Sequence, residues 1–206
     1  MRVRSEEKRL EIVVAAADLF VELGYEHTTM SAISDRVGGS KATLYGYFKS
    51  KEELLRAVLA YDVAQEALDI LKTFPLGEDL RAALVELGAQ YLNGRLDALA
   101  ITNMRTLASL PADSDIGKEF YATVLRPAWE LLADQFRALM AAGRLRSADP
   151  WTAAMHWKGL NEAELLEPRL IGASSVPKLE EVSRITELAA DAFLTIYGTD
   201  EAAEVD

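Results

Sequence analysis

The chain has 206 residues, half of them apolar and 27% charged, which is enough to bury a hydrophobic core. The absence of cysteine excludes disulfides, thiolate zinc sites and a cysteine nucleophile. The two histidines, His27 and His156, lie far apart in the sequence, so we expect no metal site and no cofactor. No apolar run reaches the roughly 18 residues that span a bilayer, so we expect a cytoplasmic protein with no membrane partner.

The net charge of −11 is unevenly distributed along the chain. Residues 1–55 contain eight Lys or Arg and nine Asp or Glu, whereas residues 56–206 contain fourteen and twenty-four. The acidity therefore belongs to the C-terminal three-quarters, and a locally positive surface near the N-terminus remains compatible with the sequence. The net charge excludes only a protein that coats polyanions indiscriminately.

The first 55 residues contain signals for four helices. Apolar residues at helical spacing predict the first helix over 10–23. Two short helices, over 30–36 and 41–47, are separated by a pair of glycines, and a Ser-x-x-Glu capping box opens a fourth helix that reaches about residue 71. The expected stop and cap residues are Gly24, Thr28 or Thr29, Gly38, Gly39, Ser40 and Ser50.

Beyond residue 77 the sequence predicts further helices and no sheet, because no segment alternates apolar and polar residues for more than a few positions. Pro127 is expected to kink or split one of these helices. Residues 199–206 are expected to form a frayed acidic tail. The chain is thus predicted to be all-α with about nine helices, the later ones over about 78–93, 97–109, 114–142, 150–170 and 178–197.

The two short helices and the glycine turn between them have the arrangement of a helix-turn-helix. The second helix begins with small or hydrogen-bonding residues, which suit a helix end that enters the major groove of DNA. Ordinary helix caps on a solvated edge are the alternative. The candidate DNA-contacting residues are Thr28, Thr29, Ser40, Lys41, Ala42, Thr43, Tyr45, Tyr47 and Lys51.

One set of residues in this region carries a resemblance to a known family: Ala15-Ala16, Leu19-Phe20, Gly24-Tyr25, Thr28-Thr29, Ile33, Ser40, Thr43-Leu44-Tyr45, Tyr47-Phe48 and Ser50-Lys51-Glu52-Glu53-Leu54. With them, about fifty residues resemble the DNA-binding domain of TetR-family repressors without a gap. The resemblance implies a homodimer whose recognition helices read successive major-groove half-sites of a palindromic operator. It also implies base and phosphate contacts from residues 40–43, and backbone contacts from Tyr45, Tyr47, Lys51 and the threonine pair. Gly39 and Gly46 depart from the family's pattern.

The resemblance further implies a helix-turn-helix domain over 1–53 and a ligand-sensing and dimerising domain over 54–198. The run from Gly143 to Leu166 resembles the C-terminal domain of AefR- or AcrR-type members and suggests a small-molecule effector. Candidate residues for an apolar effector cavity are Met104, Arg105, Phe120, Tyr121, Trp129, Phe136, Trp157 and Asn161. Packing in the core is the alternative for each aromatic residue. Arg105 is expected to pair with Glu119, with Glu162 or with an acidic ligand, or to form a surface salt bridge.

The last helix carries an apolar stripe that a monomer would leave partly exposed. We expect the last two long helices to form a four-helix bundle with those of a second copy. Core packing within one chain is the alternative for any single residue. The candidate dimer-interface residues are Trp151, Leu160, Leu179, Val182, Leu188 and Phe193.

These features predict a ligand-responsive transcriptional repressor whose DNA binding is relieved by a small, largely apolar effector, with the long helix after Lys51 as the lever. An enzyme is disfavoured, because Gly-x-Ser-x-Gly is absent and the run from Gly38 to Lys41 lacks the spacing of a phosphate loop. The alternative is a helical ligand-binding or protein-interaction module that has lost DNA binding. Gly39, Gly46 and the acidic total favour that alternative.

Overall fold

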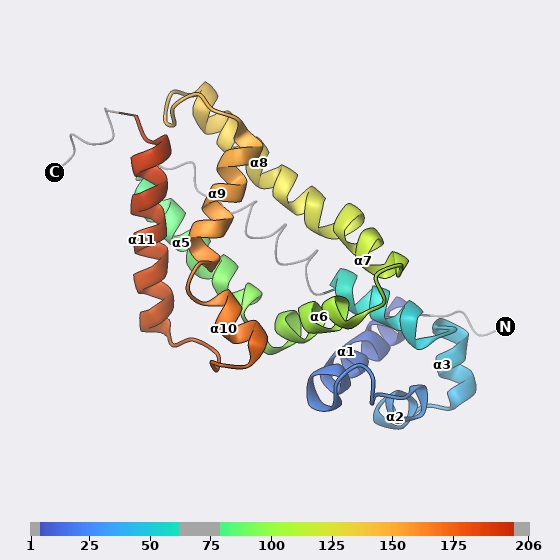
Figure 1. Ribbon diagram of the computed structural model, residues 1–206. Coiled ribbons are helices and arrows are strands. Elements are labelled where there is room, and N and C mark those ends of the chain that lie inside the picture. Colours follow the sequence, from blue (N-terminus) through green and yellow to red (C-terminus); the bar gives the residue numbers. More distant parts are fainter. Residues whose placement is uncertain (1–4, 62–78, 200–206) are drawn as a thin grey trace. The chain divides into compact units, whose positions relative to one another are not determined.

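The computed structural model describes residues 5–61 and 79–199, and all its regular elements in these ranges are helices (Figure 1). The predicted all-α class is confirmed, although two predicted helices are divided. Residues 51–61 are also helical, whereas the predicted continuation of this helix to residue 71 and most of the predicted acidic tail lie outside the described residues. The elements are α1 (Glu6–Leu23), α2 (Met30–Arg36), α3 (Lys41–Tyr47), α5 (Leu80–Arg95), α6 (Ala98–Ser109), α7 (Asp115–Phe120), the π-helix η1 (Tyr121–Leu125), α8 (Arg126–Ala141), α9 (Pro150–Glu162), α10 (Leu166–Ile171) and α11 (Leu179–Tyr197).

The N-terminal helices begin at the side chains that cap them. The hydroxyl of Thr29 accepts a hydrogen bond from the N–H of Ala32 at 3.1 Å, and the hydroxyl of Ser40 accepts one from Thr43 at the same distance. These caps satisfy N–H groups that have no partner within their own helix. α2 and α3 therefore have the predicted bounds, whereas α1 starts earlier than predicted because Ser5 caps it.

Two predicted helices are divided, and proline explains each division. The helix expected over 114–142 consists of α7, the π-helix and α8, with Pro127 in the first turn of α8 as the expected splitting residue. The helix expected over 150–170 breaks at residues 163–165. Pro168 has no N–H to donate to Glu164 four residues earlier, and its ring would clash with that carbonyl, so a new helix begins with Pro168 in its first turn.

The chain forms two compact units, the first comprising Met1–Gln65 and Ala98–Val124 and the second Glu66–Asp97 and Leu125–Asp206. In the first unit, α1 packs against α2 and α6, and α2 packs against α3. In the second unit, α11 packs against α5 and α9, and α8 packs against α9. The predicted boundary between residues 53 and 54 stays a prediction.

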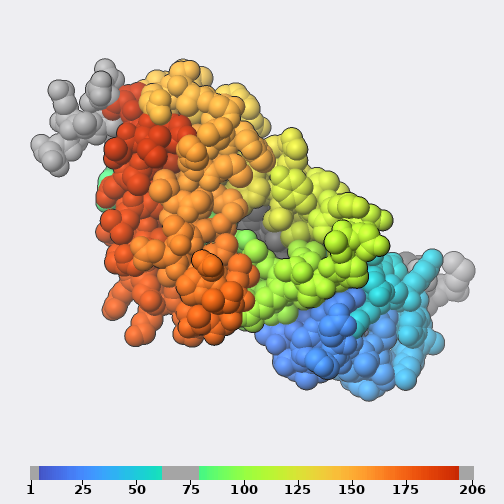
Figure 2. Space-filling model, in the orientation of Figure 1, coloured from blue at the N-terminus to red at the C-terminus, as the bar shows by residue number. Residues whose placement is uncertain are grey.

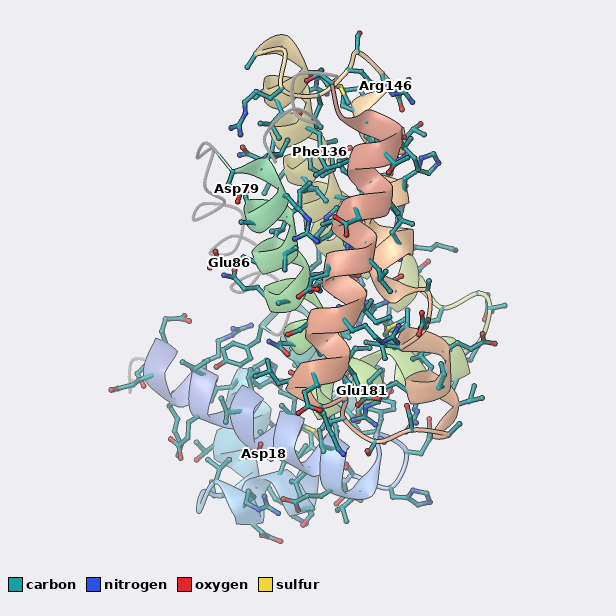
Figure 3. The ribbon with its side chains drawn as sticks, turned by 90° about the vertical axis from the view of Figure 1, so that its left-hand side faces the viewer. Asp18, Asp79, Glu86, Phe136, Arg146 and Glu181 are labelled. Atoms are coloured by element: carbon teal, nitrogen blue, oxygen red, sulfur yellow. The ribbon has the colours of Figure 1, made fainter. Side chains whose placement is uncertain are left out.

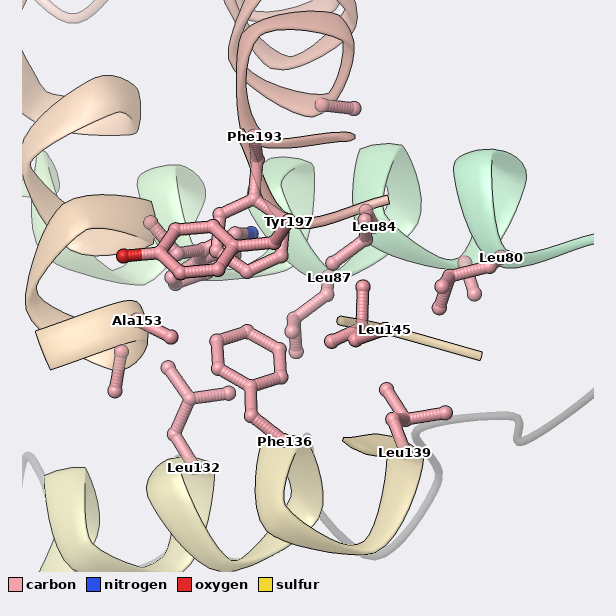
Figure 4. Packing of buried hydrophobic residues seen from close by; sticks show 14 of the residues in the cluster. Leu80, Leu84, Leu87, Leu132, Phe136, Leu139, Leu145, Ala153, Phe193 and Tyr197 are labelled. Atoms are coloured by element: carbon pink, nitrogen blue, oxygen red, sulfur yellow. The ribbon is translucent and has the colours of Figure 1, made fainter. Parts of the chain in front are cut away.

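The core of the second unit is built from the apolar faces of α5, α8, α9 and α11 (Figure 4). Phe136 and Phe193 are both fully buried, and their ring centroids lie 5.0 Å apart. Tyr197 continues this stack, 4.8 Å from Phe193. Figure 3 shows Phe136 among the helices of this unit, whereas Asp79 and Glu86 lie along the outer side of α5. Phe136 therefore belongs to the core, which was the alternative to its predicted role in an effector cavity.

A glycine allows α5 to approach α9 and α11 closely. A Cβ atom on Gly88 would lie 2.5 Å from Oδ1 of Asn161 and 3.0 Å from Cγ2 of Thr186. Asn161 is 1% exposed, and its amide nitrogen donates to the carbonyl of Trp157 at 2.9 Å. The Asn161 side chain thus lies against Gly88 where these helices cross, and among the described residues its Oδ1 has no hydrogen-bond partner, so its predicted contact with an effector stays a prediction.

Candidate nucleic-acid interface

One face of α3 is buried and the other is exposed. Leu44 and Phe48 are 3% and 1% exposed, and they anchor α3 in the first unit, where Ile33 of α2 is fully buried. The opposite face carries small, polar and aromatic side chains, and the atoms of α3 lie at the surface of this unit (Figure 2). Its exposed residues, with the cap residue that precedes it, are Ser40, Lys41, Ala42, Thr43 and Tyr45.

The turn between α2 and α3 is closed by a serine rather than by an apolar side chain. Gly38 has a φ of +67°, a left-handed conformation that favours glycine. Ser34 is 2% exposed, and its hydroxyl donates to the carbonyl of Gly39 at 2.9 Å. The N–H of Gly39 in turn donates to the carbonyl of Ser34 at 3.1 Å. The turn at Gly39, which departs from the family's pattern, is thus held by two hydrogen bonds to one residue.

Seven of the nine candidate DNA-contacting residues can reach a ligand on this face. Thr29 is exposed at the start of α2. Tyr47 is half-buried, and its hydroxyl accepts a hydrogen bond from the N–H of Ser5 at 3.2 Å, which leaves the hydroxyl hydrogen to donate. The other five are the exposed residues of α3 and its cap. Of the nine candidates, Thr28 is buried, Tyr47 and Lys51 are half-buried, and the other six are exposed.

The remaining two candidates, Thr28 and Lys51, are hydrogen-bonded within the protein. Thr28 is 1% exposed, and its hydroxyl lies 2.8 Å from the carbonyl of Gly24. The ammonium of Lys51 lies 2.7 Å from the carbonyl of Tyr25 and 4.2 Å from the centroid of the Tyr25 ring. Both side chains bond to carbonyls of the turn that leads from α1 to α2, and their contacts with phosphates stay predictions.

The cations around α3 differ in whether they are paired. Arg36 is neutralised by Glu22, with 2.7 Å between the closest nitrogen and oxygen, and Lys8 is paired with Glu11. Among the described residues, 5–61 and 79–199, neither Lys41 nor Lys49 forms an ion pair. The ammonium of Lys41, at the start of α3, is therefore available to an anion or to an acceptor on a base edge.

The eight candidate effector residues divide equally between the two units. Met104, Arg105, Phe120 and Tyr121 belong to the first unit, and the others belong to the second. Arg105 is exposed, which agrees with the alternative of a surface salt bridge rather than a buried pair. Glu119, one of its proposed partners, is bound by Arg56 at 2.7 Å. Glu162, the other, is bound by residues of the second unit.

Glu162 joins polar and aromatic residues of the second unit into one cluster. Nε of Arg95 donates to its carboxylate at 3.0 Å, and the Lys158 ammonium and the Tyr91 hydroxyl also donate to it. The ring centroid of Tyr91 lies 5.5 Å from that of Trp129 and 5.4 Å from that of Trp157. We call Tyr91, Arg95, Trp129, Trp157, Lys158 and Glu162 the Glu162 cluster.

The cluster keeps its groups in defined protonation states. Burial raises the pKa of Glu162, but the hydrogen bonds from Lys158 and Tyr91 and the charges of Lys158 and Arg95 outweigh burial, so the pKa lies below its ordinary value. Burial and the Glu162 charge raise the pKa of Tyr91 well above its ordinary value, so its hydroxyl remains a donor. Trp157 is 2% exposed, and its Nε1–H has no hydrogen-bond partner among residues 5–61 and 79–199. The sequence analysis identified the two tryptophans and named Glu162 only as a possible partner of Arg105. It did not identify Tyr91, Arg95 or Lys158, although Lys158 and Glu162 show the i, i+4 spacing of a helical ion pair.

The candidate dimer-interface residues differ in exposure. Leu179 and Leu188 on α11 are 74% and 53% exposed. Val182 and Phe193 are 1% and 0% exposed, so they pack in the core of their own chain. Trp151 and Leu160 on α9 are half-buried.

Within residues 5–61 and 79–199, no group of three or more His, Asp or Glu side chains is placed to hold a metal ion. In the same ranges no helix is both long enough and apolar enough to cross a bilayer.

The fold and the exposed face of α3 define a transcriptional regulator with a DNA-binding helix-turn-helix. The family model described as "Bacterial regulatory proteins, tetR family" matches residues 12–58. A second, described as "AefR-like transcriptional repressor, C-terminal domain", matches residues 82–199, more than half of the chain. The chain belongs to the TetR family of bacterial regulators.

Individual relatives agree with this assignment. The chain is 45% identical over 58 residues to the HTH-type transcriptional activator FasR of Mycolicibacterium smegmatis, a match that covers 28% of this chain and 26% of FasR. The matches to the first three curated relatives cover only 26% to 49% of those relatives' lengths.

Solved structures match over nearly the whole chain. A TetR-family regulator from Mesorhizobium loti has the same fold, with a TM-score of 0.86, 24% identity, and coverage of 96% of this chain and 100% of that one. The flavonoid-responsive regulator FrrA matches with a TM-score of 0.70 and 26% identity, over 95% of this chain and 100% of FrrA.

Proposed function

We propose that the protein is a ligand-responsive repressor that binds a palindromic operator as a homodimer and releases it when a small effector binds. The observation that carries the proposal is the two-sided character of α3. Leu44 anchors the helix in the core, while the outward face presents Lys41, Thr43 and Tyr45 to a partner. The description of the C-terminal family model supports repression. The match to the activator FasR makes the direction of regulation the first property to test.

The outward-facing residues divide into two kinds of DNA contact. Lys41 and Thr43 can donate to base edges in the major groove, and Ala42 lets the helix approach the bases closely. Thr29, Tyr45 and Tyr47 can donate to phosphates on either side. In a symmetric dimer, two such helices would lie about 34 Å apart, one turn of B-DNA.

The effector is proposed to bind in the second unit, at the Glu162 cluster. Three aromatic rings offer an apolar wall, and Trp157 offers a buried N–H that has no partner. Ligand sites combine apolar walls with a few polar groups in this way. The name of FrrA, a flavonoid-responsive regulator, supports a response to a small molecule. An effector releases DNA only if it binds the dimer more tightly in the conformation that does not bind DNA than in the one that does.

The proposed regulator has no catalytic activity and acts in the cytoplasm, where its operator lies. The alternative, a helical module without DNA binding, rested on Gly39, Gly46 and the acidic total. The closed turn at Gly39 and the unpaired ammonium of Lys41 weigh against it.

Selection from a library of random DNA duplexes tests the proposal. We expect a palindromic sequence that the protein binds with a Kd on the order of 10⁻⁸ M or tighter, and a steep loss of affinity as salt is raised. Lys41→Met or Thr43→Val should relax the preference at one base position of each half-site. Tyr45→Ala should weaken binding to all sequences alike. Equal affinity for selected and scrambled duplexes would favour the interaction module instead.

A further inference from the structure

The end of α3 that is proposed to read bases has no side chain of its own in the core. Residues 40–43, the cap and the first turn of the helix, are all exposed. The buried residue of α3 is Leu44, and Phe48, which is also buried, follows at the C-terminal cap. Core packing therefore holds the later part of α3, whereas the position of its first turn depends on the residues that lead into it.

The chain that leads into α3 is bonded to α2 through Ser34. The hydroxyl of Ser34 donates to the carbonyl of Gly39 at 2.9 Å, and the N–H of Gly39 donates to the carbonyl of Ser34 at 3.1 Å. Because Ser34 is only 2% exposed, its hydroxyl is directed at the protein and not at a ligand on the surface. Two bonds between the same two residues fix where the chain lies when α3 begins.

Gly39 contributes no side-chain contact to this turn. Among the described residues, no atom lies within 4 Å of the place that a Cβ on Gly39 would take, and its φ is not positive. Neither close packing nor the backbone conformation therefore requires a glycine there. With no side chain at residue 39 to pack against the core, the turn is joined to α2 by the Ser34 hydroxyl and by backbone hydrogen bonds.

We infer that Ser34 is a positioning residue for DNA recognition, which holds the first turn of α3 in the place where it meets the bases. This inference rests on the proposed DNA binding and adds to it a residue that the candidate DNA contacts do not include. Without the hydroxyl, the start of α3 would occupy several positions, and DNA binding would have to select one of them. Affinity falls in proportion to the population of the arrangement that binds.

The loss of one hydrogen bond sets the size of the effect. It lowers the population of the held turn about fivefold. Each subunit of the proposed dimer presents one α3, so two turns must be ordered when the operator is bound. We therefore expect Ser34→Ala to weaken operator binding about 25-fold.

Binding to scrambled duplexes separates positioning from a general loss of folded protein. Non-specific binding depends on phosphate contacts and not on base edges, so it needs no exact placement of the first turn of α3. Ser34→Ala should leave the affinity for scrambled duplexes within about twofold of wild type. A variant that merely contains less folded protein loses affinity for both kinds of duplex alike.

The matched control is Ile33→Val, at the fully buried neighbour of Ser34 in α2. Removing one methyl group there lowers stability by an amount comparable to the loss of a hydrogen bond, but it leaves both bonds to Gly39 in place. Both affinities are measured at a temperature at which circular dichroism shows every variant folded, with the operator taken from the random-library selection. Ile33→Val should leave both affinities within about twofold of wild type.

Hydrogen exchange at the N–H of Gly39, measured by NMR in the free protein, reports the turn directly. Ser34→Ala should speed this exchange about fivefold. Unchanged exchange, equal weakening of operator and scrambled duplexes, or an operator affinity equal to that of Ile33→Val would overturn the inference. If the wild-type protein prefers no duplex, the proposed function fails, and exchange at Gly39 still shows whether Ser34 holds the turn.

Discussion

At the residue scale, the most constrained group of the second unit is the carboxylate of Glu162. Its side chain is 10% exposed and accepts from Tyr91, Arg95 and Lys158. A buried charge is tolerated only when it is paired and hydrogen-bonded, and removing one partner of such a group costs several kcal/mol. Glu162 therefore ties α5 to α9 through Tyr91 and Arg95.

Glu162→Gln is expected to destabilise the protein by about 3 kcal/mol at pH 7, because it leaves Arg95 and Lys158 without their shared carboxylate. The pKa of Glu162 is lowered in the folded protein, so its contribution is fully present above its ordinary pKa of 4.5 and is lost as pH falls through the lowered value. The difference in the free energy of unfolding between wild type and variant should therefore become smaller below about pH 4.5. Urea unfolding of both proteins from pH 7 to pH 3 measures this difference. The control is Glu167→Gln, at an exposed glutamate. A difference in unfolding free energy that does not change with pH would contradict the stabilising role of the ionised Glu162.

At the element scale, the end of α11 shows how a helix obtains its missing donors. The last carbonyls of a helix have no partner within it. Here the N–H of Arg146 donates to the carbonyl of Tyr197 at 2.8 Å, and its guanidinium donates to the carbonyl of Ile196. The same guanidinium lies 5.2 Å from the centroid of the Tyr197 ring. Arg146 thus closes the C-terminus of α11 from the loop that follows α8.

Arg146→Ala should destabilise the protein by about 1 kcal/mol, because one of these carbonyls loses a charged donor and Tyr197 loses its cation. The matched control is Arg137→Ala, which removes an exposed pair with Asp134 and should cost no more than about 0.5 kcal/mol. Thermal or urea unfolding of both variants gives the comparison. Equal effects would show that Arg146 acts as an ordinary surface arginine.

Local signals in the sequence were enough to predict the bounds of some helices. The caps at Thr29 and Ser40 predicted the bounds of α2 and α3, because an N-cap acts within one helical turn. Pro127 predicted the division between α7 and α8 for the same local reason. The break before α10 was also readable from Pro168, but the prediction overlooked it.

At the scale of the whole molecule, apolar side chains remain exposed on α11. Leu179 and Leu188 are 74% and 53% exposed, while Val182 and Ile185 on the same helix are buried. α11 thus has exposed apolar side chains in addition to the apolar face that is buried within its own chain. A second copy of the chain, packed against α9 and α11, is the proposed partner for the rest.

Leu188→Glu is expected to weaken dimerisation at least about a hundredfold and to leave the subunit folded, because it would place a charge in an apolar interface but leaves the core intact. Sedimentation velocity over a range of concentrations measures the dimer, and circular dichroism reports the fold. The matched control is Leu131→Glu, an exposed leucine of α8, which should leave the dimer unchanged. A Leu188→Glu dimer as tight as wild type would exclude Leu188 from the interface.

The sequence by itself determined the helical class, the bounds of α2 and α3 and the outward face of α3, because caps, glycines and apolar periodicity act over a few residues. Tertiary structure decided which polar side chains are still available. Thr28 looks like a DNA contact in the sequence, yet its side chain is buried and its hydroxyl lies against the carbonyl of Gly24. The Glu162 cluster likewise joins residues about seventy positions apart, which no local pattern reports. A hydrogen-bonding group serves whichever acceptor the fold brings nearest, and that acceptor is known only when the chain is folded.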